Sequence, residues 1–283
     1  MAITLKSLAH KTAVITGGSG GIGLALAHMA AEQGAHVWLL ARRDALLAEA
    51  RAALAHHAGS ADFIVADVAN WHQVKQAMAR IEAKTGAPDL VVNTAGITHP
   101  GYVHEIPVEI YREVVDINYM GTVHVVQAAL PGMLARGSGY IVNFSSVAGY
   151  VTGPGYGAYS PSKYAVRGYS DVLRTELKPR GVGVSIVFPP DTDTAQLAHE
   201  RRLKTPELRH LQDNAGLGPL RFGVLSPEQV ARDTLRGISR GRYTILPGRV
   251  NALLYRFVGI AGDLVLPITD GEWATARRKH GRS

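Results

Sequence analysis

Short apolar runs alternate with longer amphipathic segments over the first 190 residues. The runs are apolar throughout, as expected for strands that are covered on both faces. They comprise Ala13–Thr16, His36–Leu40, Phe63–Ala66, Leu90–Val92, Tyr140–Phe144 and Val182–Phe188. Helical periodicity marks the segments between them, Gly23–Gln33, Ala45–His57, Trp71–Lys84, Val108–Leu134 and Ala158–Lys178. Strands that alternate with helices predict one α/β domain with a doubly wound parallel sheet.

The pattern changes after Phe188. Pro189-Pro190 ends the sixth run, and residues 199–214 are predicted to form one helix. Ser226-Pro227 has the form of an N-cap followed by proline at the first helical position, which predicts a helix to about Arg240 and then an edge strand at Tyr243–Leu246. We expect residues 1–247 to form the main domain, with about 190–225 covering its ligand. Residues 248–283 are expected to add an apolar helical extension with a basic tail.

Charge separates the two parts of the chain. Residues 1–198 hold 15 basic and 15 acidic side chains, whereas residues 199–283 hold 15 basic and 8 acidic ones, so the net charge of +7 arises in the last third. Such a field could attract nucleic acid, an anionic membrane or a phosphorylated ligand. The basic region lacks interleaved aromatic residues and any known nucleic-acid-binding motif, so we expect no nucleic-acid partner.

Several absences narrow the chemistry and the location. The chain has no cysteine, which excludes disulfides and thiolate chemistry, and its twelve histidines show no metal-binding spacing, so no metal is expected. Met1–Lys11 has no apolar signal region, and no window reaches about 18 uncharged apolar residues. We therefore expect a cytoplasmic protein. Residues 248–283 are either a peripheral contact with a membrane face or a helix that packs on the sheet or on a partner subunit.

A glycine-rich turn, Thr16-Gly17-Gly18-Ser19-Gly20-Gly21-Ile22-Gly23, joins the first predicted strand to the first predicted helix. Glycines allow a tight turn and a close approach to a ligand, and a helix N-terminus offers free N–H groups to a pyrophosphate. This position therefore predicts a dinucleotide site. The expected cofactor contacts are Gly17, Ser19, Gly20, Gly21, Ile22 and Gly23.

The end of the second strand indicates which dinucleotide binds. NAD-selective folds place Asp or Glu near this point for the ribose 2′-hydroxyl, but this chain has Arg42 and Arg43. Two guanidinium groups suit a 2′-phosphate, so we expect NADPH/NADP⁺. Asp67 follows the third strand and is expected to accept from the adenine amino group.

Tyr159 and Lys163 are four residues apart on a predicted helix, so their side chains share one face. A nearby cation stabilises a phenolate, and lowering the tyrosine pKa toward the working pH would suit general acid–base catalysis. Ser146 lies thirteen residues upstream, after the fifth strand. Together with the glycine-rich turn, these residues indicate an enzyme.

In this order, the motifs resemble those of the short-chain dehydrogenase/reductase family. The matching residues are Thr16–Gly23, Asp67, Asn93-Thr94-Ala95-Gly96, Asn118, Ser146, Tyr159 and Lys163, and the resemblance covers about residues 10–245. It implies a Rossmann fold and an NADP-dependent oxidoreductase acting on CH–OH or ketone groups. The chain departs from the family pattern in two places: Thr94 stands where a second Asn is usual, and Pro190 replaces the usual Gly.

The resemblance also implies roles for individual residues. Tyr159 would protonate the carbonyl oxygen, Ser146 would hold that oxygen, and Lys163 would lower the tyrosine pKa and bind the nicotinamide ribose. Asn118 would fix a water that relays protons to Lys163. Further cofactor contacts are implied for Val68, Asn93, Pro189, Thr192 and Thr194. Relatives form dimers or tetramers through the helices that carry Asn118 and Tyr159, so a homo-oligomer is expected.

Within the family, Phe188-Pro189-Pro190-Asp191-Thr192-Asp193-Thr194 resembles the corresponding loop of 3-ketodihydrosphingosine reductases. That likeness implies a lipid-like substrate, reduced with NADPH during sphingolipid synthesis. Leucines that could line a route for its alkyl chain, or belong to the core, are Leu197, Leu203, Leu208, Leu211 and Leu217. Two alternatives remain: reduction of another apolar ketone, such as a steroid or 3-oxoacyl group, and a non-catalytic nucleotide-binding sensor or lipid carrier.

Overall fold

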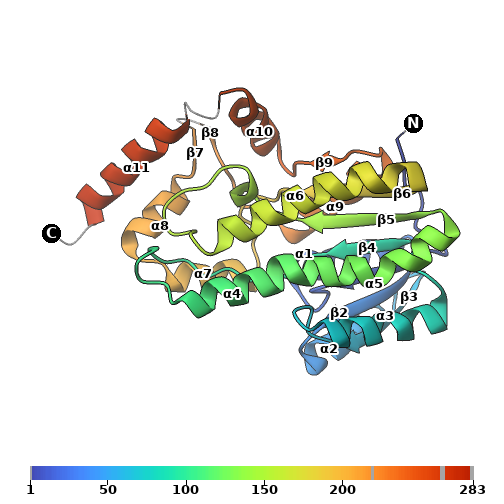
Figure 1. The fold of residues 1–283 in the computed structure, drawn as a ribbon. Coiled ribbons are helices and arrows are strands. Elements are labelled where there is room, and N and C mark those ends of the chain that lie inside the picture. The colour runs from blue at the N-terminus through green and yellow to red at the C-terminus, as the bar shows by residue number, and fades with distance from the viewer. Residues whose placement is uncertain (1, 218–219, 262–264, 281–283) are drawn as a thin grey trace.

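Seven parallel strands form one sheet in a computed structural model that describes residues 2–217, 220–261 and 265–280. The spatial order is β3-β2-β1-β4-β5-β6-β9, and the strand directions are visible in Figure 1. Their bounds are β1 Thr12–Thr16, β2 His36–Ala41, β3 Ser60–Val65, β4 Leu90–Asn93, β5 Gly139–Phe144, β6 Val182–Val187 and β9 Thr244–Ile245. The order reverses between β1 and β4, which is the topological switch point where doubly wound sheets bind ligands. The predicted fold class is confirmed.

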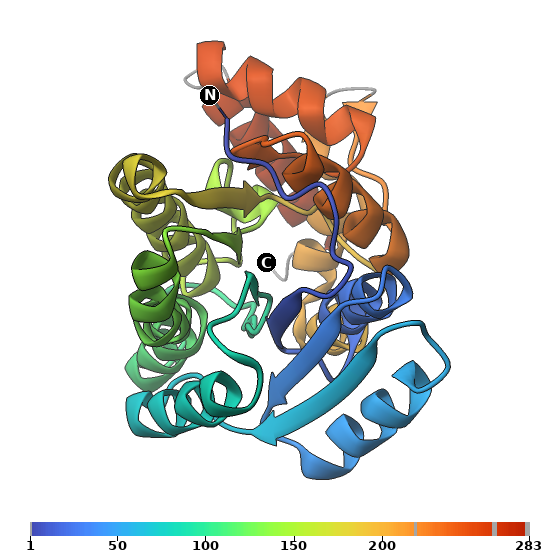
Figure 2. The same cartoon turned by 90° about the vertical axis from the view of Figure 1, so that its right-hand side faces the viewer.

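Helices cover both faces of the sheet (Figure 2). One layer holds α1 (Gly21–Glu32), α2 (Asp44–Leu54) and α9 (Pro227–Ser239), and the other holds α3 (Trp71–Thr85), α5 (Gly121–Arg136) and α6 (Tyr159–Leu177). Neighbouring residues of one strand serve different layers: Val14 of β1 packs toward the second layer and Ile15 toward the first. Because side chains alternate along a strand, apolar residues at every position fill both cores.

The predicted helix over Val108–Leu134 is interrupted. It consists of α4 (Val108–Val115), a π-helical turn at Asp116–Met120 and then α5. The extra residue in a π turn shifts the side chains that follow it around the helix axis, and such turns are frequent at functional sites. This one contains Asn118.

The chain after β6 folds over the carboxyl ends of the strands (Figure 1). The single helix expected over residues 199–214 is wrong, because α7 (Ala195–Leu203) and α8 (Pro206–Asp213) are separate. Pro206 cannot continue a helix but suits the first position of a new one, and Thr205 caps α8 by accepting from the Leu208 N–H. A short hairpin of β7 (Gly216–Leu217) and β8 (Leu220–Arg221) follows.

Two helices, α10 (Arg249–Ala261) and α11 (Val265–His280), complete the described chain. One face of α10 packs on the domain: Asn251 is buried, accepts from the Tyr150 hydroxyl at 2.5 Å and donates to the Phe188 carbonyl at 2.6 Å. Helix α11 lies beside α8 (Figure 1). One face of the extension therefore packs on the domain, and the opposite face of α10 remains exposed. Gly281, Arg282 and Ser283, at the end of the basic tail, lie outside the described residues.

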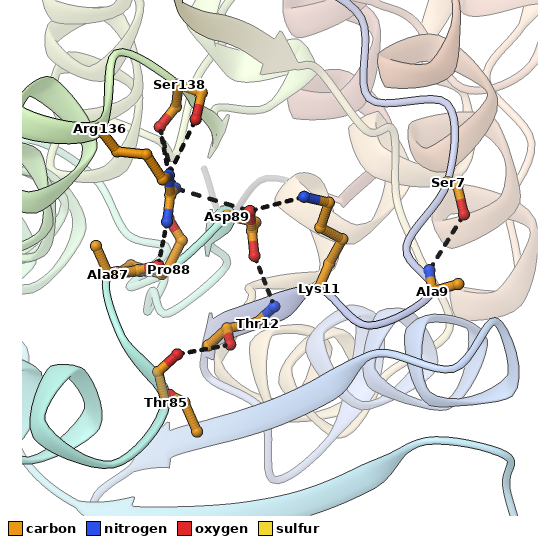
Figure 3. Close-up of polar contacts among 10 residues, drawn as sticks. All are labelled: Ser7, Ala9, Lys11, Thr12, Thr85, Ala87, Pro88, Asp89, Arg136 and Ser138. Carbon is orange, nitrogen blue, oxygen red and sulfur yellow. Dashed lines mark hydrogen bonds and ion pairs between the residues drawn. The ribbon is translucent and has the colours of Figure 1, made fainter.

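The amino edge of the sheet is tied together by Asp89, which precedes β4 (Figure 3). Its carboxylate accepts from Lys11 Nζ at 3.1 Å and from the Thr12 N–H at 3.0 Å. Arg136, at the end of α5, lies 3.8 Å from this carboxylate and donates to the carbonyls of Ala87 and Pro88 at 2.5 and 2.7 Å. These contacts fix the starts of β1 and β4. They lie at the end of the sheet opposite to the carboxyl ends of the strands.

Candidate active site

A cavity of about 640 Å³ opens at the carboxyl ends of the strands, above the switch point. Its inner wall comes from the glycine-rich turn and the loops after β2, β3 and β5, and its outer wall from α7, α8, α10 and α11. Most residues that the sequence assigned to cofactor binding line it: Gly17, Ser19, Gly20, Gly21, Ile22, Gly23, Arg42, Arg43, Asp67, Val68, Tyr159, Lys163, Pro189, Thr192 and Thr194.

The glycine-rich turn packs against the residues that follow β4 and leaves space on its other side. Gly17 has φ +65°, and a Cβ there would meet the Ala95 backbone nitrogen at 3.0 Å, so both conformation and space require glycine. No atom of the described residues lies within 4 Å of the position a Cβ would take on Gly20, the residue before α1. In the described part of the chain no side chain caps α1, so its first N–H groups face the cavity without a partner from a capping residue. This arrangement fits a pyrophosphate.

The residues after β2 and β3 border the cavity beside this turn. Arg42 and Arg43 are exposed on the rim, and Arg43 immediately precedes α2. Asp67 accepts from the Ala69 N–H at 3.0 Å through one carboxylate oxygen. The two guanidinium groups are therefore available to an anion, and the second oxygen of Asp67 is available to a donor.

Tyr159, Lys163 and Ser146 meet on the inner wall. Lys163 is buried, donates to the Phe144 carbonyl at 3.1 Å, and places Nζ 5.6 Å from the centre of the Tyr159 ring. Ser146 Oγ accepts from the Ala148 N–H at 3.2 Å and forms a side-chain hydrogen bond with Tyr159. The Ala148 N–H occupies one of the two lone pairs of Ser146 Oγ, so the hydroxyl keeps its proton for a bond to Tyr159 or to a substrate oxygen.

Burial shifts both ionisable groups of this pair. Burial lowers the pKa of Lys163 to about 8, because the apolar surroundings disfavour the ammonium form. Burial also raises the pKa of Tyr159, and the negative charges of Glu200 and Asp191 add to that increase, whereas the bond to Ser146 opposes it. The protein groups around Tyr159 therefore raise its pKa, and the expected lowering is not seen. The phenol remains protonated, which suits a proton donor.

Three other predicted residues have structural contacts. Asn118 lies in the π turn, where its Oδ1 accepts from the Ile97 N–H at 2.8 Å and its Nδ2 donates to Ser162 Oγ at 3.0 Å. Asn93 does not line the cavity: its Nδ2 donates to Asn143 Oδ1 at 2.9 Å inside the sheet. Ser145, the residue before Ser146, donates to the Lys163 carbonyl at 2.9 Å and so holds α6 against the end of β5. Neither asparagine side chain is therefore placed among the residues that line the cavity.

The loop after β6 brings a further predicted residue to the turn. Thr194 caps α7 by accepting from the Leu197 N–H at 3.3 Å, and a Cβ on Gly21 would meet its methyl group at 3.0 Å. Thr192 donates to the Pro190 carbonyl at 2.9 Å. The loop thus closes over the glycine-rich turn from the outer side.

The outer wall is largely apolar and was only partly foreseen. Leu197, Leu208 and Leu211 line the cavity, whereas Leu203 is 44% exposed and does not; the Leu217 side chain lies outside what the structure describes. Leu254 and Val258 of α10 and Thr269 and Glu272 of α11 also contribute. Sequence reasoning missed these last four, because nothing in an amphipathic pattern states which surface a distant helix will cover.

A polar cluster next to Tyr159 was also missed. It consists of Tyr156, Asp191, Glu200, Lys204 and Gln212, from the segment before α6, the loop after β6, α7 and α8. The Tyr156 and Tyr159 rings lie 6.1 Å apart. The available signal was the presence of Asp191 directly after Pro189-Pro190, at the carboxyl end of a strand.

Comparison with known proteins agrees with this geometry. The family profile described as short chain dehydrogenase matches residues 11–205. A 3-dehydrosphinganine reductase of Danio rerio is 34% identical over 236 residues, which cover 82% of this chain and 69% of that protein. One from Arabidopsis thaliana is 36% identical over 248 residues, 86% of this chain and 72% of that protein.

Among solved structures, a short chain dehydrogenase/reductase from Burkholderia phymatum in complex with NAD has a TM-score of 0.79 and 27% identity, and the match covers 92% of this chain and 96% of that chain. The part of the chain that the family profile matches contains the glycine-rich turn at the switch point and the serine, tyrosine and lysine on one wall of the cavity. This chain belongs to the short-chain dehydrogenase/reductase family.

Proposed function

We propose that this enzyme reduces the ketone of 3-ketodihydrosphingosine to the alcohol of dihydrosphingosine with NADPH. The observation that carries the proposal is the position of Ser146, Tyr159 and Lys163 on the inner wall of a cavity whose outer wall is lined by leucines. A reducible carbonyl can meet the tyrosine while a long alkyl chain runs along the apolar side. The names of the relatives from zebrafish and Arabidopsis support the same substrate.

The cavity fits a nicotinamide dinucleotide. The uncapped start of α1 and the open space at Gly20 would hold the pyrophosphate, and Arg42, with Arg43, would hold a 2′-phosphate. Lys163 donates to the Phe144 carbonyl and has further N–H donors that would bind ribose hydroxyls. When bound, the dinucleotide supplies the hydride that reduces the ketone carbon.

The residues of the chain supply position and the proton. The Ser146 hydroxyl holds the carbonyl oxygen beside the Tyr159 hydroxyl, which donates its proton to that oxygen as negative charge develops there. The positive charge of Lys163 then stabilises the phenolate that remains. Asn118, fixed between Ile97 and Ser162, would hold a water that returns a proton toward Lys163.

Turnover of competing ketones tests the proposal. NADPH consumption is measured with 3-ketodihydrosphingosine in mixed micelles, beside a steroid ketone and a short 3-oxo ester at matched concentrations. We expect preferential turnover of the sphingoid ketone. Equal or greater turnover of either competitor would assign the enzyme to another apolar ketone, and NADPH binding without turnover of any ketone would favour a sensor or carrier.

We also propose that the enzyme works at the cytoplasmic face of a membrane, through the outer face of α10. Leu253, Phe257 and Ile260 recur at helical spacing there and are 52%, 40% and 89% exposed. Arg249 and Arg256 lie on the same helix, and Arg277, Arg278 and Lys279 end α11. Such a face suits an anionic lipid surface. None of the helices in the described ranges is long and apolar enough to span a membrane.

Vesicle flotation tests this contact. The wild-type enzyme is expected to float with anionic vesicles and less with neutral ones, and Phe257→Ser with Ile260→Ser should abolish flotation. Equal flotation of the double variant would refute the assignment of this face. Because Leu254 and Val258 of the same helix line the cavity, a bound membrane would lie next to the substrate entrance.

The oligomeric state is a further part of the proposal. Tyr164 and Val172 on α6 are 41% and 53% exposed and lie two turns apart on one helix face, which a second copy of the chain could cover. We expect a homo-oligomer assembled through α5 and α6. Light scattering coupled to size-exclusion chromatography should give a dimer or tetramer for the wild type and a smaller species for Val172→Arg.

A further inference from the structure

The cluster beside Tyr159 has a definite charge balance. Lys204 Nζ lies 2.5 Å from Glu200 Oε1, with the two side chains 1% and 9% exposed, so these two charges neutralise each other. Arg201, the next cation along α7, lies 2.8 Å from Asp213. Within the described chain no Lys, Arg or His nitrogen comes within 4.0 Å of the Asp191 carboxylate. One negative charge on the cavity wall therefore lacks a direct counter-ion.

The hydrogen bonds of the cluster also leave an acceptor without a partner. Gln212 Nε2 donates to Asp191 Oδ2 at 2.7 Å and lies 3.5 Å from Glu200 Oε1, which fixes the amide with its NH₂ toward the carboxylates. Gln212 Oε1 is buried and accepts no hydrogen bond from any described residue. The Tyr156 hydroxyl is already committed, because it donates to Glu200 at 2.7 Å. The wall thus presents the Asp191 carboxylate, which accepts from the Gln212 amide, and the Gln212 carbonyl, which has no donor among the described residues.

Burial makes this arrangement costly for the free protein. Asp191 lines the cavity in the loop after β6. Desolvation and the charge of Glu200 raise its carboxyl pKa, and the Gln212 bond and the more distant charges of Lys204 and Arg201 only partly oppose that increase. A partly desolvated carboxylate without a direct counter-ion, beside a carbonyl without a donor, gains most from a ligand that brings both a positive charge and N–H donors. A protonated amine provides both.

We propose that Asp191 and Gln212 form a subsite for the ammonium group of an α-amino ketone, and that Asp191 determines the preference of the enzyme for amino ketones over neutral ketones. This inference rests on the proposed function, since the amine of 3-ketodihydrosphingosine is bonded to the carbon next to its carbonyl. An ammonium held by Asp191 places that carbonyl toward Tyr159. Asp191 is thus a specificity-determining residue.

The position of the cluster supports this role. Tyr156 bonds the same Glu200 that Gln212 approaches, and its ring lies 6.1 Å from that of Tyr159. The charges of Asp191 and Glu200 act on the Tyr159 hydroxyl and raise its pKa. An ammonium at Asp191 would offset one of these charges and so help the tyrosine release its proton only when the amino ketone is bound.

Substitution by the isosteric amide tests the subsite. Asp191→Asn is compared with wild type on 3-ketodihydrosphingosine and on the deamino ketone, which keeps the chain and both oxygens. We expect kcat/KM for the amino ketone to fall about 10- to 100-fold, with little change for the deamino ketone, because only the charge-assisted bond is lost. An equal loss on both substrates, or no loss on either, would overturn the proposal.

The chain offers a matched control two residues away. Asp193 is exposed and does not line the cavity, so Asp193→Asn should keep the wild-type kcat/KM on both substrates. Gln212→Met removes the second acceptor while keeping a similar volume, and it should reduce the amino preference by about 3- to 10-fold. If Asp191→Asn does not fold, this second variant decides, and an unchanged preference in it would count against the subsite.

A binding measurement separates this inference from the proposed reaction. Calorimetry with dodecylamine and dodecanol reports ammonium preference without turnover. If no sphingoid ketone is reduced, the proposed function fails, but the subsite stands when wild type binds the amine at least about tenfold more tightly than the alcohol and Asp191→Asn does not. Equal affinity of the wild type for the amine and the alcohol, or an amine preference that survives in Asp191→Asn, would refute the subsite even if the reaction is confirmed.

Discussion

The two edges of the sheet use charged side chains in opposite ways. At the amino edge, Asp89 has Lys11 and the Thr12 N–H as partners, and Arg136 is held by the carbonyls of Ala87 and Pro88 (Figure 3). At the carboxyl edge, Lys163 has one hydrogen bond, to Phe144, and Asp191 has no direct counter-ion among the described residues. The first cluster is satisfied within the chain, and the second is not.

This difference distinguishes charged side chains that stabilise the fold from those that bind a ligand. Buried polar groups are normally paired, because an unpaired group costs free energy on folding. A cluster that keeps unpaired groups on a cavity wall, as the carboxyl edge does, is more stable once a ligand supplies the missing partners. Substitutions at the two edges should therefore have opposite signatures: loss of activity at one and loss of stability at the other.

The largest effect is expected for Tyr159→Phe, which removes the proton donor and keeps the ring. Turnover of the sphingoid ketone should fall about 10²- to 10⁴-fold, while thermal stability and NADPH affinity remain near wild type. Steady-state kinetics with a parallel cofactor titration measures both. Tyr164→Phe, on the exposed side of α6, is the matched control and should remain active. Unchanged turnover in Tyr159→Phe would remove this residue as the acid.

The cofactor end of the carboxyl edge is tested by Arg42→Asp. Loss of a charge-assisted bond to the 2′-phosphate, with repulsion added, should weaken NADPH binding about 10- to 150-fold and NADH binding much less. Fluorescence titration with each dinucleotide gives the ratio. Arg80→Asp, an exposed substitution on α3, should leave both affinities unchanged. An equal loss of affinity for NADPH and NADH would show that Arg42 does not bind the 2′-phosphate.

Sequence patterns predicted the sheet because each strand is short, apolar and covered on both faces. Val182–Phe188, for example, was predicted one residue longer than β6. The π turn at Asp116–Met120 and the break between α7 and α8 were missed. The apolar periodicity continues through the π turn and so hides it. At the break, the N-cap signal of Thr205-Pro206 stands between two segments that both have helical periodicity.

The candidate site divides in the same way. Gly17, Ser146, Tyr159 and Lys163 were found because local spacing and family motifs mark them. Asp191 and Gln212 were not, since they meet only after α8 folds back over the loop that follows β6. Asn93 is a different case: its motif is in place and its side chain bonds Asn143 inside the sheet, so its cofactor contact stays a prediction. Sequence can indicate which residues surround the turn, but not which polar groups will remain unpaired.

The pH dependence offers a smaller effect at the carboxyl edge. With a pKa of about 8, Lys163 is an ammonium below that pH and loses its charge above it. The neutral amine no longer stabilises the Tyr159 phenolate, so kcat/KM for ketone reduction should fall by up to about tenfold per pH unit above 8. The deamino ketone is the substrate of choice, because it does not titrate. A flat profile up to pH 10 would mean that the charge of Lys163 is not required.

At the amino edge, Asp89→Asn should lower the stability of the fold without affecting catalysis. The amide keeps the shape of the carboxylate but loses its charge toward Lys11 and Arg136, and one of its two ends can no longer accept. We expect the free energy of unfolding to fall by about 1–3 kcal/mol, with kcat/KM unchanged. Denaturant titration beside steady-state kinetics measures both.

Asp62→Asn is the matched control for this change. Asp62 lies 2.6 Å from Lys84, whose side chain is 60% exposed, so its loss should cost less than about 1 kcal/mol. If Asp89→Asn reduced activity while stability held, the amino edge would share in function and the contrast between the two edges would be wrong. If instead Asp89→Asn costs more stability than Asp62→Asn and both remain active, the satisfied cluster is structural, and the unpaired groups of the opposite edge are the ones that serve the ligand.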